Sequence, residues 1–295
     1  MLGRLRSLLE LIRFSHTAFA LPFALSSAAL AWQDKPFHVL DLVGILLCMV
    51  FARSAAMAFN RLADRHYDAD NPRTATRHLP RGRLTVRAVW LFTLVCAAGF
   101  VASTLLFVQT SDNWWPLYLS GPVLGFVCAY SYTKRFTSLA HFWLGASLFL
   151  APVSAWIALR GLEDLRVPVV LGLAVLFWVA GFDILYACQD VDFDRKAGLR
   201  SVPARLGVAA SLRIALGCHL VMVALLLRLF WMSPHLGVVY LTGVGLVAVL
   251  IAGEHWLVRP DDLSRVNQAF FQVNGIISVG LFIILLVQLA VNAGG

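Results

Sequence analysis

Long apolar runs follow one another along almost the whole sequence. A helix needs about 20 mostly apolar residues to cross the hydrocarbon core of a bilayer. Runs of this kind lie at 16–33, 39–60, 86–108, 114–130, 137–159, 167–190, 208–230, 235–252 and 268–292. Apolar residues make up 60% of the 295 residues and charged residues only 14%, a balance typical of a surface that faces lipid. The sequence therefore predicts an all-α integral membrane protein with nine transmembrane helices in one domain over 1–295, and it excludes a water-soluble fold.

Basic residues are distributed unevenly between the ends of these runs. A net charge of +8 and a pI near 9.7 could indicate a nucleic-acid partner, but the basic residues lie in short loops beside apolar runs. If the N-terminus is cytoplasmic, most of the 24 Lys and Arg fall on that side. The opposite side keeps Lys35, Arg160, Arg166 and Arg228. The positive-inside rule therefore predicts a cytoplasmic N-terminus. Because the basic residues serve this topology, we expect membrane lipid as the surrounding partner and no nucleic-acid partner.

Acidic residues are concentrated at the ends of two runs. Asp64 and Asp68 close the second run, and Asp190 and Asp194 close the sixth run with the same four-residue spacing. Like charges four residues apart on a helix repel each other unless a cation lies between them. Hard oxygen ligands favour Mg²⁺ or Mn²⁺, and Mg²⁺ usually keeps waters and bridges to phosphate. The pattern predicts a divalent metal with a phosphorylated ligand. A solvated helix end, with salt bridges to neighbouring arginines, is the alternative.

The two acidic segments have similar surroundings. Four runs separate them, so the runs 39–60 and 167–190 point the same way, and each leads into a basic loop that contains proline. This similarity suggests a parallel repeat that places equivalent carboxylates face to face across a bundle. Basic residues of the cytoplasmic loops could neutralise diphosphate oxygens, or each could serve only to set the topology. They are Arg73, Arg77, Lys134, Lys196 and Arg200.

Three of the ionisable residues within the runs are candidates for binding a substrate. Arg53 lies seven residues before Asn60, on the same helix face and deeper in the bilayer, where an arginine is costly without a partner. Asp183 lies seven residues before Asp190, and a pair between Arg53 and Asp183 is one interpretation. In the other, Arg53 receives the carboxylate of a substrate while Asp183 contacts its hydroxyl or assists deprotonation. His16 either hydrogen-bonds the same acceptor or is a buried bundle histidine.

Three motifs carry a family resemblance. The stretch from Asn60 to Arg77 resembles the first aspartate-rich motif of the UbiA superfamily of intramembrane prenyltransferases, and the stretch from Asp183 to Lys196 resembles the second. Tyr130-Ser-Tyr-Thr-Lys134 is similar to the Tyr-x3-Lys element of that family. The segments 13–23 and 183–205 are most similar to the 4-hydroxybenzoate polyprenyltransferase branch, which includes relatives assigned to menaquinone synthesis through futalosine. One departure is Asn60-Arg61, where many members carry Asn-Asp.

The resemblance implies a bundle around a central cavity open to lipid, in a bacterial inner (plasma) membrane, with its active site on the cytoplasmic side. It implies Mg²⁺-dependent (or Mn²⁺-dependent) transfer of a polyprenyl group from a polyprenyl diphosphate to an aromatic acid, either 4-hydroxybenzoate or a naphthoate analogue, in ubiquinone or menaquinone biosynthesis. The implied catalytic residues are Asp64, Asp68, Asp190, Asp194 and Asp183, the first four holding the metal mostly through waters and diphosphate. The implied diphosphate ligands are Asn60, Arg73, Arg77, Tyr130, Lys134 and Lys196. The implied acceptor ligands are Arg53, Asp183 and His16.

Two other functions remain open on the sequence alone. A prenyltransferase of this kind could act on a haem, a chlorophyllide, dihydroxynaphthoate or a glycerol phosphate lipid, because acceptor choice depends on the shape of the pocket. A secondary transporter could use carboxylates for ion coupling, but transporters place such groups near the bilayer midplane. Most acids here lie at helix ends beside basic loops, which favours capture of a diphosphate.

Overall fold

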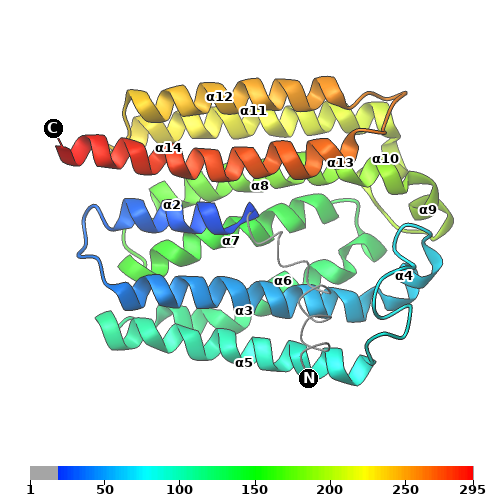
Figure 1. Ribbon diagram of the computed structural model, residues 1–295, viewed down its shortest axis with the longest axis horizontal. Coiled ribbons are helices and arrows are strands. Elements are labelled where there is room, and N and C mark those ends of the chain that lie inside the picture. The colour runs from blue at the N-terminus through cyan, green and yellow to red at the C-terminus, as the bar shows by residue number, and fades with distance from the viewer. Residues whose placement is uncertain (1–18, 295) are drawn as a thin grey trace. The chain divides into compact units, whose positions relative to one another are not determined.

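The computed structural model describes residues 19–294, except for the side chains of residues 268–270, and these residues are almost entirely helical (Figure 1). No β-strand occurs in this range, which contains one isolated bridge between Arg259 and Asp262. The elements are α2 (Leu21–Ala31), α3 (Val39–Ala63), α4 (Arg65–Asp70), α5 (Val86–Ser111), α6 (Trp115–Phe136), α7 (Ala140–Arg160), α8 (Arg166–Ala187), the 3₁₀-helix η2 (Cys188–Asp190), α9 (Val191–Lys196), α10 (Val202–Leu206), α11 (Val208–Met232), α12 (Val238–Leu257), α13 (Val266–Gln268), the π-helix η3 (Ala269–Val273) and α14 (Asn274–Gly294). The all-helical prediction is confirmed for this part of the chain.

Each of the nine predicted ranges contains a helix, and seven helical segments within residues 19–294 are long and apolar enough to cross a membrane. They are 39–63, 86–111, 140–160, 166–196, 208–232, 238–257 and 271–294. The helix α2 is apolar but has only 11 residues, and α6 contains Pro122 and ends with Lys134 and Arg135. The chain is therefore an integral membrane protein. A total of nine spans, and their orientation, remain predictions.

One compact unit contains residues 38–133. Its two long helices, α3 and α5, run antiparallel and side by side (Figure 1). Aromatic rings pack onto glycines at this interface: a Cβ atom on Gly44 would lie 2.7 Å from the Phe107 ring, and one on Gly99 would lie 2.9 Å from the Phe51 ring. Small residues allow membrane helices to approach closely because no hydrophobic effect drives them together in lipid. This packing fixes the helix that leads into the first acidic segment.

A second compact unit contains residues 19–37 and 134–294. Six helices of this unit form a ring in which each helix packs against the next, in the order α7, α8, α11, α12, α14 and α2. The helix α2 closes the ring by packing against α7. Among the helices of this ring that are long enough to span a membrane, α8 is the most buried, and its Trp178, Val179, Ala180 and Ile184 have no exposed surface. At Gly145 the backbones of α7 and α8 come so close that a Cβ atom would overlap the carbonyl oxygen of Leu176. This contact sets the spacing of the helices that lead into the second acidic segment.

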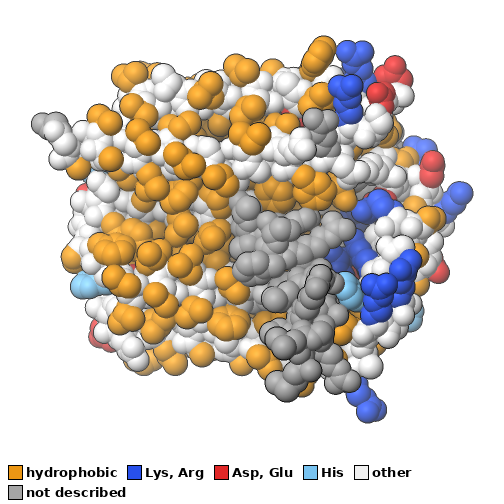
Figure 2. Space-filling view, in the orientation of Figure 1, with side chains coloured by type: hydrophobic (Ala, Val, Ile, Leu, Met, Phe, Trp, Pro, Cys, Tyr) orange, Lys and Arg blue, Asp and Glu red, His pale blue; other side chains and the backbone are white. Residues whose placement is uncertain are grey.

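The outer surfaces of the long helices are apolar. Figure 2 shows hydrophobic side chains along α12 and α14, and Lys, Arg, Asp and Glu gathered where the chain turns between α12 and α13. On α12, Val249 and Leu246 are 69% and 59% exposed. In the other unit, Leu91 and Leu94 on α5 are similarly exposed. Such surfaces are suited to lipid, as the composition predicts.

Candidate functional site

The first acidic segment begins where α3 ends. Asp64 follows the last residue of α3 with φ −95° and ψ 6°, and α4 starts at the next residue. The helix is interrupted at Asp64, so Asn60, Asp64 and Asp68 do not lie on one continuous helix. Two backbone hydrogen bonds nevertheless keep the four-residue register, from Asp64 N to Asn60 O (2.9 Å) and from Asp68 N to Asp64 O (2.8 Å). The side chains also meet, since Asn60 Nδ2 donates to Asp64 Oδ2 at 2.8 Å.

Asp68 is the buried carboxylate of this segment, with 6% of its surface exposed. Its Oδ1 accepts a hydrogen bond from Arg77 Nη1 at 2.5 Å. Its Oδ2 is buried without a hydrogen-bond partner among the described residues and lies 3.9 Å from Arg61 Nη1. Arg61, the residue that departs from the family pattern, is itself buried. The alternative given above was a solvated helix end with salt bridges to arginines. Asp68 does have an arginine partner, but it is buried and not solvated.

The second acidic segment has the same local construction. After α8 the 3₁₀-helix η2 ends at Asp190, whose φ of −104° and ψ of 9° are close to those of Asp64, and the six-residue helix α9 follows, as the six-residue α4 follows Asp64. Four residues on, Asp194 is 2% exposed, and its Oδ2 also lacks a hydrogen-bond partner within residues 19–294. The nearest cation that forms an ion pair with it is Lys134, with Nζ 3.9 Å from that oxygen. The two segments therefore share their local backbone conformation as well as their spacing, and the placement of their carboxylates face to face stays a prediction.

These carboxylates fit a hydrated metal better than a closed protein cage. No group of three or more His, Cys, Asp or Glu in the described chain is arranged to hold a metal ion. Mg²⁺ usually keeps several waters and is bound through one or two carboxylates together with substrate phosphates. A buried carboxylate oxygen without a partner, as on Asp68 and on Asp194, is the group that such a cation would satisfy.

Asp183 has a partner that the sequence did not predict. Its Oδ2 lies 2.6 Å from His141 Nδ1, which comes from α7 and is fully buried. The other ring nitrogen, Nε2, accepts a hydrogen bond from the backbone N–H of Val202 at 3.3 Å. Since Nε2 accepts, Nδ1 carries the proton and donates it to Asp183. The sequence did contain a signal for this contact, since His141 is the one histidine in the apolar run 137–159. An ionisable side chain within a membrane span is costly unless it has a partner or a function.

The other predicted residues are placed as follows. Arg53 lies on α3, and its Nε is buried without a hydrogen-bond partner in the described part of the chain. Arg73 and Lys196 are exposed, and Tyr130 is half-buried. His16 lies outside the described residues. The pair between Arg53 and Asp183, and the roles assigned to all of these residues, remain predictions.

The end of α6 is tied to the second acidic segment. The carbonyl oxygen of Lys134 accepts a hydrogen bond from Arg200 N at 2.6 Å, and Arg200 Nη1 donates to Phe136 O at 2.8 Å. Both the backbone and the side chain of Arg200 therefore donate hydrogen bonds to backbone carbonyl oxygens at the end of α6. This arrangement holds Lys134 beside Asp194.

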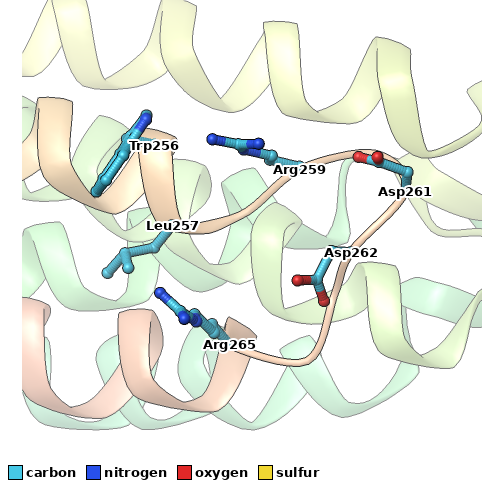
Figure 3. Close-up of a pocket in the computed structure, with 6 residues that line it drawn as sticks. All are labelled: Trp256, Leu257, Arg259, Asp261, Asp262 and Arg265. Carbon is cyan, nitrogen blue, oxygen red and sulfur yellow. The ribbon is translucent and has the colours of Figure 1, made fainter.

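A cavity of about 330 Å³ lies at the turn between α12 and α13 (Figure 3). Figure 3 shows Trp256 and Arg259 next to each other at the end of α12, with Arg259 Cζ 6.0 Å from the ring centroid, and Arg265 on the α13 side. The carboxylate of Asp262 accepts hydrogen bonds from Ser264, which lower its pKa from the usual value. None of the predicted site residues lines this cavity, so it does not belong to the acidic site.

The long apolar helices identify an integral membrane protein. Two of them lead into buried aspartates that lie beside arginine or lysine, and such groups are suited to a divalent cation and an anionic ligand. The chain belongs to the UbiA prenyltransferase family, which matches residues 20–276, and it is therefore an enzyme that transfers prenyl groups. This finding confirms the resemblance seen in the three motifs.

Similar proteins are found among curated relatives and solved structures. The chain is 33% identical over 237 residues to 4-hydroxybenzoate octaprenyltransferase of Marinobacter nauticus, covering 79% of this chain and 77% of that protein. It is 35% identical over 240 residues to the enzyme of the same name from Tolumonas auensis, covering 81% and 79%. The apo structure of a UbiA homolog from Aeropyrum pernix K1 has a TM-score of 0.80 and 31% identity, covering 95% and 98%. A UbiA homolog from Archaeoglobus fulgidus bound to GPP and Mg²⁺ shares the fold, with a TM-score of 0.71 and 21% identity, covering 96% and 99%.

Proposed function

We propose that this enzyme transfers a polyprenyl group from a polyprenyl diphosphate to an aromatic acid, 4-hydroxybenzoate or a naphthoate analogue. The reaction takes place at the cytoplasmic side of a bacterial inner membrane and supplies a precursor of ubiquinone or menaquinone. Membership of the UbiA prenyltransferase family supports the type of reaction. The relatives named 4-hydroxybenzoate octaprenyltransferase support an aromatic acid as the acceptor.

The observation that carries the proposal is the unpartnered carboxylate oxygen in each acidic segment. Leaving a buried acceptor unsatisfied costs about 1–3 kcal/mol, and both Asp68 and Asp194 have such an oxygen. Together with Asp64 and Asp190 they are the residues that would hold Mg²⁺. When bound, Mg²⁺ lowers the charge of the diphosphate and makes it a better leaving group.

Basic and polar side chains bind the remaining phosphate oxygens in this proposal. Arg77 lies beside Asp68 and Lys134 beside Asp194, and in this proposal both also contact the phosphates. Asn60 orients Asp64 through its hydrogen bond. Arg73, Lys196 and Tyr130 supply further donors. Charge-assisted hydrogen bonds of this kind are the stronger ones in proteins.

The acceptor is bound by Arg53 and Asp183. The buried Arg53 Nε has a donor available for the carboxylate of the aromatic acid. Asp183 accepts a hydrogen bond from the phenolic hydroxyl and so increases the electron density of the ring. A ring carbon forms the bond to C1 of the prenyl group, the C1–O bond breaks with both electrons leaving on the diphosphate, and the ring proton passes to the released diphosphate.

Water must be kept from the allylic carbon during this step. In the unit that contains α8, four buried aromatic rings from residues 19–23 and from α8 pack together. They are Phe19, Phe23, Trp178 and Phe182. Their ring centroids lie 5.0–6.4 Å apart along the contacting pairs, and in this proposal the apolar cluster helps to keep water out.

The test uses membranes that contain the protein, with prenyl diphosphates of several chain lengths crossed with several aromatic acids. We expect prenylated product with Mg²⁺ and none with excess chelator. Asp68→Asn and Asp194→Asn should lower the rate by at least about 100-fold because each removes a charge that faces the diphosphate site. The matched controls are Asp70→Asn and Asp192→Asn, which change exposed residues of the same short helices. Full activity in chelator, or equal losses in the controls, would contradict the proposal.

A further inference from the structure

We infer that His141 is a positioning residue that fixes the carboxylate of Asp183 for the aromatic acceptor. The inference rests on the proposed function and assigns a role to a side chain outside the predicted site. His141 acts through Asp183 and does not itself contact the substrate.

The two oxygens of Asp183 have different surroundings. Oδ2 is held by His141 Nδ1 at 2.6 Å, while Oδ1 has no hydrogen-bond partner among the described residues. The Asp183 side chain is 14% exposed and the His141 side chain is fully buried. One oxygen is therefore engaged and the other is available, which is the arrangement that an acceptor hydroxyl requires.

The tautomer of His141 is fixed from its other side. The Val202 N–H, in the first turn of α10, points to Nε2 at 3.3 Å, so this nitrogen must carry the lone pair. Nδ1 is then the donor of the hydrogen bond to Asp183. A histidine that orients a functional residue often has its tautomer fixed by a hydrogen bond at its other ring nitrogen, as the Val202 N–H does here.

The surroundings also restrict movement of the pair. Ile184, Leu185 and Val202 belong to one buried apolar cluster against which Phe142 packs. One turn beyond His141, Gly145 brings α7 into backbone contact with α8. Rotation of the Asp183 carboxylate is thus limited by a partner that itself has no room to move.

A purely structural role is the competing explanation, in which His141 matters only because it anchors α10 through Val202. The two hydrogen bonds can be separated with two amides. In His141→Asn the amide nitrogen reaches the Nδ1 position and keeps a donor for Asp183. In His141→Gln the longer amide reaches the Nε2 position and keeps an acceptor for Val202. His141→Leu removes both.

The assay measures kcat and KM for 4-hydroxybenzoate with each variant in membranes. We expect His141→Leu and His141→Gln to lower kcat/KM for the acceptor on the order of 10- to 100-fold, the range for losing a hydrogen bond to a charged group. His141→Asn should recover most of the loss. KM for the prenyl diphosphate should stay unchanged in all three. Rescue by Gln and not by Asn, or unchanged kcat/KM in His141→Leu, would overturn the inference.

A double-mutant cycle with Asp183→Asn decides the case in which both amides fail. If His141 acts through Asp183, His141→Leu has little further effect once Asp183 is replaced. Additive losses would show a separate structural role and overturn the inference. Failure of the proposed function is seen separately, because the wild-type protein would then prenylate none of the aromatic acids tested.

Discussion

Gly145→Ala tests whether the α7–α8 contact controls both stability and the His141–Asp183 pair. The new Cβ would overlap the Leu176 carbonyl oxygen and lie 3.1 Å from its carbon, both inside the 3.4 Å of ordinary contact. The obstacle is backbone, so the helices must separate. Overpacking of this kind costs about 1–3 kcal/mol. Alanine gains about 0.5–1 kcal/mol over glycine in a helix, which offsets only part of it.

Gly217→Ala in α11 is the matched control, because nothing lies within 4 Å of the position a Cβ would take. That variant should be as stable as the wild type or slightly more stable. The assay is thermal unfolding in detergent together with prenyl transfer. We expect Gly145→Ala to unfold several degrees lower and to lose activity below its unfolding temperature, because the widened interface weakens the His141–Asp183 hydrogen bond. Gly145→Ala with wild-type stability and activity would refute this reasoning.

Two further predictions concern polar contacts away from the acidic segments. Asn274→Ala removes the acceptor of Trp178 Nε1 (2.6 Å) and the donor to Glu254 Oε1 (2.8 Å), and all three side chains are fully or almost fully buried. We expect the free energy of unfolding to fall by about 2–4 kcal/mol, measured through the unfolding temperature. Asp34→Asn breaks an ion pair with Arg160 in which Asp34 is 47% exposed, and we expect less than about 1 kcal/mol and a smaller effect still in high salt. A large loss with Asp34→Asn, or none with Asn274→Ala, would contradict these expectations.

Helix positions and family were predictable because each depends on local sequence. A backbone in lipid must satisfy its own hydrogen bonds, so apolar runs of spanning length become helices, and every predicted range contains one. The interruption at Asp64 was not predicted. Spacing alone does not show that an aspartate, a poor helix former, ends α3 while the next short helix keeps the same register.

The partners of buried polar groups were not predictable. His141 lies 42 residues from Asp183 and 61 from Val202, and Trp178 lies 96 residues from Asn274. Such pairs depend on which helix faces meet, and a single sequence does not contain that information. The residues were visible as ionisable groups in apolar runs, but their chemistry follows from contacts made only in the folded chain.

In each acidic segment the buried aspartate is paired with a basic residue predicted to bind phosphate, Asp68 with Arg77 and Asp194 with Lys134. In the proposed function, a diphosphate arriving alone would have to draw these cations away, which leaves Asp194 without its ion-pair partner and Asp68 with only Arg61, 3.9 Å away. A metal ion arriving alone would displace the same cations without giving them a new anion. We therefore expect each ligand to bind more tightly when the other is present, and linkage requires the same factor in both directions. Titration of prenyl diphosphate with and without Mg²⁺, and of Mg²⁺ with and without prenyl diphosphate, should show equal cooperativity.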